Sequence, residues 1–178
     1  LEFYLPTGPY LNFFSKLLFT DEVLIGTSTL AFPRIDPFNL IRGYYIYEDD
    51  QWKNYNRNTS TDLSEYSTAF SIGKTDSSYY FGSWGQGIAR HNRNSNEISV
   101  FDRQNSNLLG IGQSPDFVVI SGLDNDTQGN MWAVSFLSDF PLNVQLNGSD
   151  DWLPYRSDAG SDLYFDIFID SFNQKWIS

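Results

Sequence analysis

The chain repeats itself along its length, and this repetition constrains the possible folds more strongly than any single motif. Each copy holds an apolar stretch, a turn with an aspartate and a second stretch that ends in an aromatic or aliphatic residue, and the copies lie at 13–27, 66–83, 117–135 and 162–178. Roughly 44 to 56 residues separate consecutive copies when they are aligned on Leu24, Tyr80, Trp132 and Trp176. A period of this length is typical of the four-stranded blades of a β-propeller.

The second half of each repeat also recurs. Three segments indicate a strand, a polar tip and another strand, and they lie at 43–56, 87–105 and 142–156. Their tips are rich in Asn, Asp, Gly and Ser, which tolerate the backbone angles of a tight hairpin. We therefore predict an all-β propeller segment of about three and a half antiparallel blades, at 11–57, 66–105, 117–156 and, for the partial blade, 162–178. Because propellers usually close with roughly four to eight blades, we expect the same polypeptide to supply the rest of the propeller on both sides.

Composition agrees with short strands and argues against several partners. Aromatic residues make up 17% of the 178 residues, and no long stretch has the periodicity of an amphipathic helix. The net charge of -11 would repel a phosphate backbone, which argues against nucleic acid as a partner. No apolar run approaches the roughly 20 residues that span a bilayer, so we expect no membrane insertion by this segment. The lack of cysteine removes disulfides and thiolate chemistry.

Two stretches in the middle of the chain carry a resemblance to a known family. One is the motif Asp-x-x-Gly-Asn-x-Trp at 126–132, and the other is FGSWGQGIARHNR at 81–93, which is followed by DRQNSNL at 102–108. Both resemble the propeller repeats of two-component regulators. The first repeat, FYLPTGPYLNFFSKLLFTDEVLIG at 3–26, is similar to the version of this repeat found in the PorZ-like propellers of the type IX secretion system of Bacteroidota.

The PorZ-like resemblance implies a non-enzymatic binding or scaffold module outside the cytoplasm, at the outer-membrane surface or in the periplasm. The family acts in a complex that attaches cargo to lipopolysaccharide, so the implied partners are other secretion-complex proteins or a surface polysaccharide. The two-component resemblance implies an alternative, a periplasmic sensor propeller that binds an oligosaccharide. The first and fourth repeats depart from the family's turn, in which glycine is expected. The first repeat has Asp21-Glu22-Val23 in its place, and the fourth has Phe172-Asn173.

Three neighbouring residues are candidates for binding a ligand or partner. Trp84 lies among glycines at 83–87, where its ring could stack on a sugar or pack against a partner, because glycine lets another backbone approach closely. The alternative is that Trp84 packs on the neighbouring blade. Arg90 and His91 follow at the end of the next predicted strand. His91 is the only histidine, which excludes metal sites with paired histidines within this chain, and its alternative role is that of an exposed strand-end residue.

A partial calcium motif overlaps the turn of the third repeat. Asp124 and Asp126 occupy the first and third positions of a calcium-binding loop, and Gly129 occupies the sixth. The twelfth position holds Ser135 instead of glutamate, so the second half of the motif is absent. Because an aspartate recurs at this turn in every repeat, we predict that Asp126 caps the hairpin through hydrogen bonds to the backbone. We expect no cofactor and keep Asp124 and Asp126 as calcium candidates.

The sequence contains no recognisable catalytic motif. It lacks a G-x-S-x-G elbow, a P-loop and an H-E-x-x-H motif, and nothing singles out two of its 22 acidic residues as a catalytic pair. The antiparallel topology predicts instead that one rim gathers the turn aspartates Asp21, Asp49, Asp50, Asp76, Asp126, Asp150, Asp151 and Asp170. We therefore predict a binding module with an acidic rim, and not an enzyme.

Overall fold

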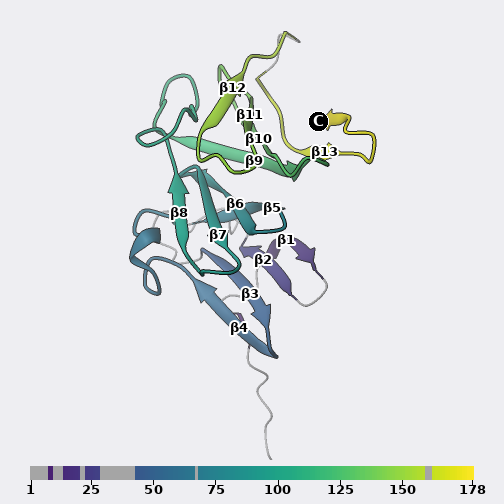
Figure 1. Ribbon diagram of the computed structural model, residues 1–178. Helices are drawn as coiled ribbons and strands as arrows, with labels where there is room; N and C mark the ends of the chain where they lie inside the picture. Colours follow the sequence, from purple (N-terminus) through teal and green to yellow (C-terminus); the bar gives the residue numbers. More distant parts are fainter. Residues whose placement is uncertain (1–7, 10–13, 21–22, 29–42, 67, 159–161) are drawn as a thin grey trace, which may run out of the picture.

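Short antiparallel strands form the whole architecture, as Figure 1 shows. The structure is a computed structural model that describes residues 8–9, 14–20, 23–28, 43–66, 68–158 and 162–178. Blade 1 consists of β1 (Phe14–Phe19), β2 (Leu24–Ser28), β3 (Tyr44–Glu48) and β4 (Gln51–Tyr55). Blade 2 consists of β5 (Ala69–Lys74), β6 (Ser78–Gly85), β7 (Ile88–Asn92) and β8 (Ile98–Phe101).

Two further units follow. Blade 3 consists of β9 (Val118–Asn125), β10 (Met131–Ser135), β11 (Leu142–Gln145) and β12 (Trp152–Tyr155). Blade 4 is the hairpin of β13 (Ile167–Ile169) and β14 (Lys175–Ile177). Among the described residues the only helix is the 3-10 turn η1 (Thr61–Leu63), and no helix there is long and apolar enough to cross a membrane. The predicted fold class, an all-β propeller segment of about three and a half blades, is confirmed.

The blades adjoin through their first strands. β1 lies next to β5, β5 next to β9, and β9 next to β13. A short antiparallel pairing of Trp84 with Val119 and of Gly85 with Val118 also joins β6 to β9. An ion pair between Lys16 and Asp166, 3.2 Å from Nζ to Oδ1, connects blade 1 with the segment before β13. The two ends of the segment are therefore in direct contact.

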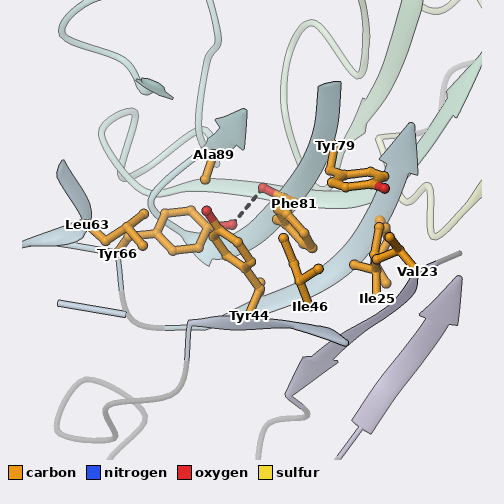
Figure 2. Packing of buried hydrophobic residues seen from close by; sticks show 11 residues of the cluster. Val23, Ile25, Tyr44, Ile46, Leu63, Tyr66, Tyr79, Phe81 and Ala89 are labelled. Atoms are coloured by element: carbon orange, nitrogen blue, oxygen red, sulfur yellow. Dashed lines mark hydrogen bonds between the residues drawn. The ribbon is translucent and has the colours of Figure 1, made fainter. Parts of the chain in front are cut away.

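Apolar side chains fill the space between successive blades. Because neighbouring residues of a strand face opposite sides of the sheet, Tyr79 and Phe81 of β6 pack toward blade 1 while Tyr80 packs toward blade 3. Figure 2 shows the first of these clusters, in which Tyr44 stacks on Phe81 with ring centroids 3.8 Å apart. A third cluster joins blade 3 to Ile167 and Ile169 of β13. Each blade thus buries its apolar faces against its neighbours.

The strand register corrects one detail of the repeat alignment. Trp132 and Trp176 each occupy the second pair after the turn, opposite Asp124 and Phe168. In blade 1 the second pair is Leu18 with Ile25, so Ile25 is the structural equivalent and Leu24 is one position too early. The turns of blades 1 and 2 both span four residues, those of blades 3 and 4 span five, and Tyr80 of blade 2 does occupy the second pair, so the offset is confined to blade 1. Spacing counted from the aspartate therefore differs between the repeats.

Candidate functional site

The turn between β9 and β10 is organised around one buried carboxylate. Asp126 Oδ1 accepts hydrogen bonds from the backbone N–H groups of Gln128 and Asn130, both at 3.0 Å. Its Oδ2 accepts from Asn130 Nδ2 and from the indole Nε1 of Trp132, both at 2.9 Å. Gly129 takes a φ of +79°, a conformation in which glycine avoids the clash that a side chain would cause. The predicted hairpin cap is confirmed.

Blade 4 repeats this arrangement with a different residue at the strained position. Asp170 accepts from the N–H groups of Phe172 and Gln174 and from Trp176 Nε1, at 2.9, 3.0 and 2.9 Å. Asn173, at φ +67°, stands where Gly129 stands in blade 3, and asparagine is among the residues that tolerate this region. The motif Asp-x-x-Gly-Asn-x-Trp is therefore a structural clasp between an aspartate and a tryptophan. The fourth repeat has Asn173 in place of the glycine of this motif, and the hydrogen bonds to the aspartate are kept.

Threonine replaces aspartate as the bonding residue in the first two blades. Thr20 Oγ1 accepts from the N–H of Val23 at 3.0 Å, and Thr75 Oγ1 accepts from the N–H of Ser78 at 3.2 Å. Asp76 lies in the turn of blade 2, but its carboxylate accepts no hydrogen bond from a described residue. Asp21 lies outside the described residues. The sequence comparison missed these threonines because it anchored each repeat on the following aspartate.

Asp124 and Asp126 accept hydrogen bonds from different parts of the chain. Asp124 Oδ2 accepts from the N–H of Ile169 in β13 at 2.6 Å, and its Oδ1 accepts from the N–H of Asn125. Burial raises the pKa of Asp124. For Asp126 burial also favours the neutral acid, but the hydrogen bonds from Trp132 and Asn130 outweigh it and lower the pKa. No group of three or more potential metal ligands occurs in the described ranges, and both carboxylates already satisfy protein donors.

Arg90 and His91 lie on opposite faces of blade 2. They are consecutive on β7, so Arg90 faces blade 3, where its guanidinium pairs with Asp150 and lies 5.1 Å from the centroid of the Phe101 ring. His91 faces blade 1 and is only 1% exposed, which overturns its alternative role as an exposed strand-end residue. The three candidate residues therefore do not converge on one site.

His91 is held between two blades by both of its ring nitrogens. Nε2 lies 3.2 Å from Asn96 Oδ1, which can only accept, so Nε2 carries the proton. Nδ1 consequently accepts a hydrogen bond from the Tyr44 hydroxyl at 2.9 Å. Burial lowers the pKa of His91 from its ordinary value of 6.5, which keeps the ring neutral. In this arrangement His91 acts as a neutral connector and offers no free nitrogen to a ligand.

This burial predicts a pH-dependent stability. As the pH falls below about 6.5, the unfolded chain binds a proton that the folded chain does not, so the free energy of unfolding decreases. We expect a loss of up to about 1.4 kcal/mol per pH unit in that range and no contribution of His91 above it. Urea denaturation at about pH 7.5 and about pH 5.5 measures the change. The variant His91→Gln cannot titrate, and an equal loss in it would assign the effect to other groups.

Trp84 packs against the next blade. Its ring lies edge-on to Phe117, with centroids 6.5 Å apart, and at a tilt 6.3 Å from Phe136. Phe136 in turn contacts Phe165 at 5.3 Å, so an aromatic row runs from blade 2 toward blade 4. Trp84 is half-buried in this row. Its contacts match the packing alternative, and a role in binding stays a prediction.

The turns of neighbouring blades meet at one rim and leave recesses between them. One recess of about 370 Å³ lies between blades 1 and 2 and is lined by the strand tips around Glu48, Asp76 and Arg93. Another, of about 230 Å³, lies between blades 2 and 3 beside Arg90 and Asp150. The first-to-second and third-to-fourth strand turns share this rim, as the antiparallel topology predicts. These polar recesses are the concave features that blade packing creates there.

Comparison with known proteins gives a likeness in structure. No protein-family model and no curated protein matches the sequence. PorZ, an essential bacterial surface component of the type IX secretion system of Porphyromonas gingivalis, matches with a TM-score of 0.81 and 16% identity, over 96% of this chain and 23% of that chain. The extracellular domain of the putative hybrid two-component system BT4673 from B. thetaiotaomicron matches with a TM-score of 0.60 and 12% identity, over 92% of this chain and 19% of that chain.

The strands, the clasped turns and these likenesses define the class of the chain, which is a β-propeller segment. Within that class it is similar in structure to PorZ, and this likeness agrees with the resemblance that the sequence indicates. The chain spans less than a quarter of the length of either solved structure. At these identities the likeness shows the fold, and what the fold is used for is a separate question.

Proposed function

We propose that this segment is a non-enzymatic, extracytoplasmic binding or scaffold module that belongs to a PorZ-like component of type IX secretion. Its partners are other proteins of the secretion complex or a surface polysaccharide. The observation that carries the proposal is the structural likeness to PorZ over 96% of the chain. A rigid stack of blades with polar recesses along one rim suits the presentation of a fixed surface to a partner.

The placement of the ionisable groups supports binding over catalysis. Both ring nitrogens of His91 are hydrogen-bonded within the protein. The carboxylates of Asp126 and Asp170 each accept hydrogen bonds from the residues of their own turn. A general acid or base needs a titratable group that can reach a substrate, and these groups are engaged by the fold itself. We therefore propose that this module acts by binding partners at its surface.

A second candidate function is the ligand-sensing propeller of a hybrid two-component regulator. The likeness to the extracellular domain of BT4673, at a TM-score of 0.60, favours it. Such a module would bind a small oligosaccharide and transmit the bound state to other domains. The two functions differ in the size of the ligand that the complete polypeptide recognises.

A titration separates the two functions. The complete polypeptide is titrated with purified surface lipopolysaccharide and with a panel of oligosaccharides, and the same titration is made with Trp84→Ala. We expect binding to lipopolysaccharide and a weakening of about tenfold in Trp84→Ala, which corresponds to the loss of one aromatic contact residue. Binding only to small oligosaccharides would support the sensor instead.

A matched variant controls for a general loss of aromatic surface. Trp176 is 60% exposed and lies on β14 of blade 4. We expect Trp176→Ala to keep the affinity of the unchanged protein. Thermal denaturation of both variants shows whether each remains folded. If neither class of glycan binds, and no secretion-complex protein is retained on the immobilised polypeptide, the proposed function is wrong.

A further inference from the structure

The recess between blades 1 and 2 has the dimensions of a site for one small group. Its volume of about 370 Å³ lies at the lower end of the range of ligand pockets in proteins. Most ligand pockets are apolar, whereas charged and hydroxyl-bearing side chains dominate this one: Glu48, Asp49, Lys53, Asp76, Tyr79 and Arg93. Its occupant should therefore be polar.

The charged hydrogen-bond donors of the recess are already engaged. Lys53 Nζ donates to Glu48 Oε2 at 2.8 Å, and this bond raises the pKa of the lysine. The Arg93 guanidinium lies 5.0 Å from the centroid of the Tyr79 ring and donates to the backbone carbonyl of Asp76 at 3.2 Å. His91, which also lines the recess, donates to Asn96. The two cations of this recess and His91 therefore each have a partner within the protein.

The acceptors of the recess are not engaged in the same way. The carboxylates of Asp49 and Asp76 accept no hydrogen bond from any residue in the described part of the chain. The hydroxyl oxygen of Tyr79 is buried without a hydrogen-bond partner, and the side chain as a whole is only 3% exposed. In Figure 2 this hydroxyl points toward Val23, which also lines the recess. A buried hydroxyl without a partner is unfavourable unless something else supplies one.

We propose that this recess binds the cationic side chain of a lysine or arginine on a partner polypeptide. The carboxylates of Asp49 and Asp76 are unused acceptors, and the Tyr79 hydroxyl oxygen can accept as well. An ammonium or guanidinium group offers three or five donors and no acceptor. Three carboxylates face two cations across the recess, and the net charge of -11 draws basic partners toward this surface. The inference rests on the proposed function as a binding module and names both the site and the chemistry of its ligand.

Titration with short peptides tests the site directly. The complete polypeptide is titrated with acetylated, amidated tetra-arginine and tetra-lysine, and with tetra-glutamate as the peptide of opposite charge. We expect the basic peptides to bind and the acidic peptide not to bind. Binding should weaken as salt is added, because charges at a surface are screened beyond a Debye length of about 10 Å at 0.1 M.

Three variants assign the binding to this recess. We expect Asp76→Asn and Asp49→Asn to weaken it about two- to fivefold each, as for exposed ion pairs. Tyr79→Phe should weaken it about tenfold, because it removes a hydrogen bond to a charged group, and should leave the protein equally stable or more stable. The matched control is Asp50→Asn, since Asp50 shares the hairpin tip and the positive φ of Asp49 but does not line the recess.

The outcomes separate the site from the broader function. Equal weakening by Asp50→Asn and Asp76→Asn would reduce the binding to general electrostatic attraction and overturn the site. Unchanged affinity in Tyr79→Phe would also overturn it. If lipopolysaccharide binds but basic peptides do not, the ligand class is wrong while the proposed function stands. If the basic peptides, both classes of glycan and the secretion-complex proteins all fail to bind, both the site and the proposed function are contradicted.

Discussion

Phe81→Ala should lose about 3 to 5 kcal/mol of unfolding free energy, the largest effect of any single truncation discussed for this protein. Phe81 is 0% exposed and stacks on Tyr44 across the interface of blades 1 and 2. Its backbone carbonyl also accepts a hydrogen bond from the Tyr66 hydroxyl at 2.6 Å. Truncation leaves a cavity that this rigid aromatic cluster cannot close. The loss is large beside the roughly 5 to 15 kcal/mol that stabilise a typical domain.

Denaturant titration followed by intrinsic fluorescence measures this loss. Phe172→Ala is the matched control, because Phe172 is 84% exposed, and we expect it to change the unfolding free energy by less than about 0.5 kcal/mol. If Phe81→Ala does not fold, Phe81→Leu retains most of the volume and should lose roughly 1 to 2 kcal/mol. Similar small losses at positions 81 and 172 would contradict the packing between the blades.

Asp126→Ala is expected to lose about 3 kcal/mol, because it leaves several donors without their acceptor at a position where the aspartate is only 4% exposed. The donors are the N–H groups of Gln128 and Asn130, the Asn130 amide and the Trp132 indole. Asp170→Ala removes the equivalent clasp in blade 4, where water can reach the same donors. Its loss should therefore be clearly smaller. Thermal denaturation of the two variants compares them.

The same experiment examines the calcium motif. We expect that added Ca²⁺ does not shift the melting temperature of the unchanged protein, because Asp126 acts as a cap and Asp124 bonds to Ile169. A ligand that binds only the folded state would raise the melting temperature, and the rise would keep growing with the logarithm of its concentration above the dissociation constant. A rise with Ca²⁺ that disappears in Asp126→Ala would show an ion at this turn. Equal losses for Asp126→Ala and Asp170→Ala would show that burial is not the deciding factor.

Several features of the fold could be predicted because they depend on residues that are close in sequence. Alternating apolar residues and turn-forming residues predicted the strands, and the groups that donate to the Asp126 carboxylate all lie within seven residues, at 126–132. The PorZ-like resemblance used the same local motifs and agrees with the structural likeness. Local spacing failed in blade 1, where the strand register makes Ile25 and not Leu24 the equivalent residue.

The candidate site was harder to predict, because its residues come from different blades. Nothing in the sequence indicated that His91 would be buried. Its hydrogen-bond partner Tyr44 lies 47 residues earlier in the chain and belongs to another blade. Trp84 stands beside glycines in the sequence, but it lies in β6 and the aromatic residues that pack on it belong to the next blade. The hydroxyl of Tyr79 became a binding candidate only when the structure showed it buried and without a partner.

The sequence by itself determined the all-β class, the repeat and the clasped turns, since each of these follows from side-chain periodicity and from hydrogen bonds within a few residues. Only the tertiary structure decided which faces of the blades meet, which carboxylates are used by the fold and which face a recess. The physical reason is that burial and hydrogen-bond satisfaction depend on contacts between blades. Those contacts join residues such as Lys16 and Asp166, which the sequence places 150 positions apart.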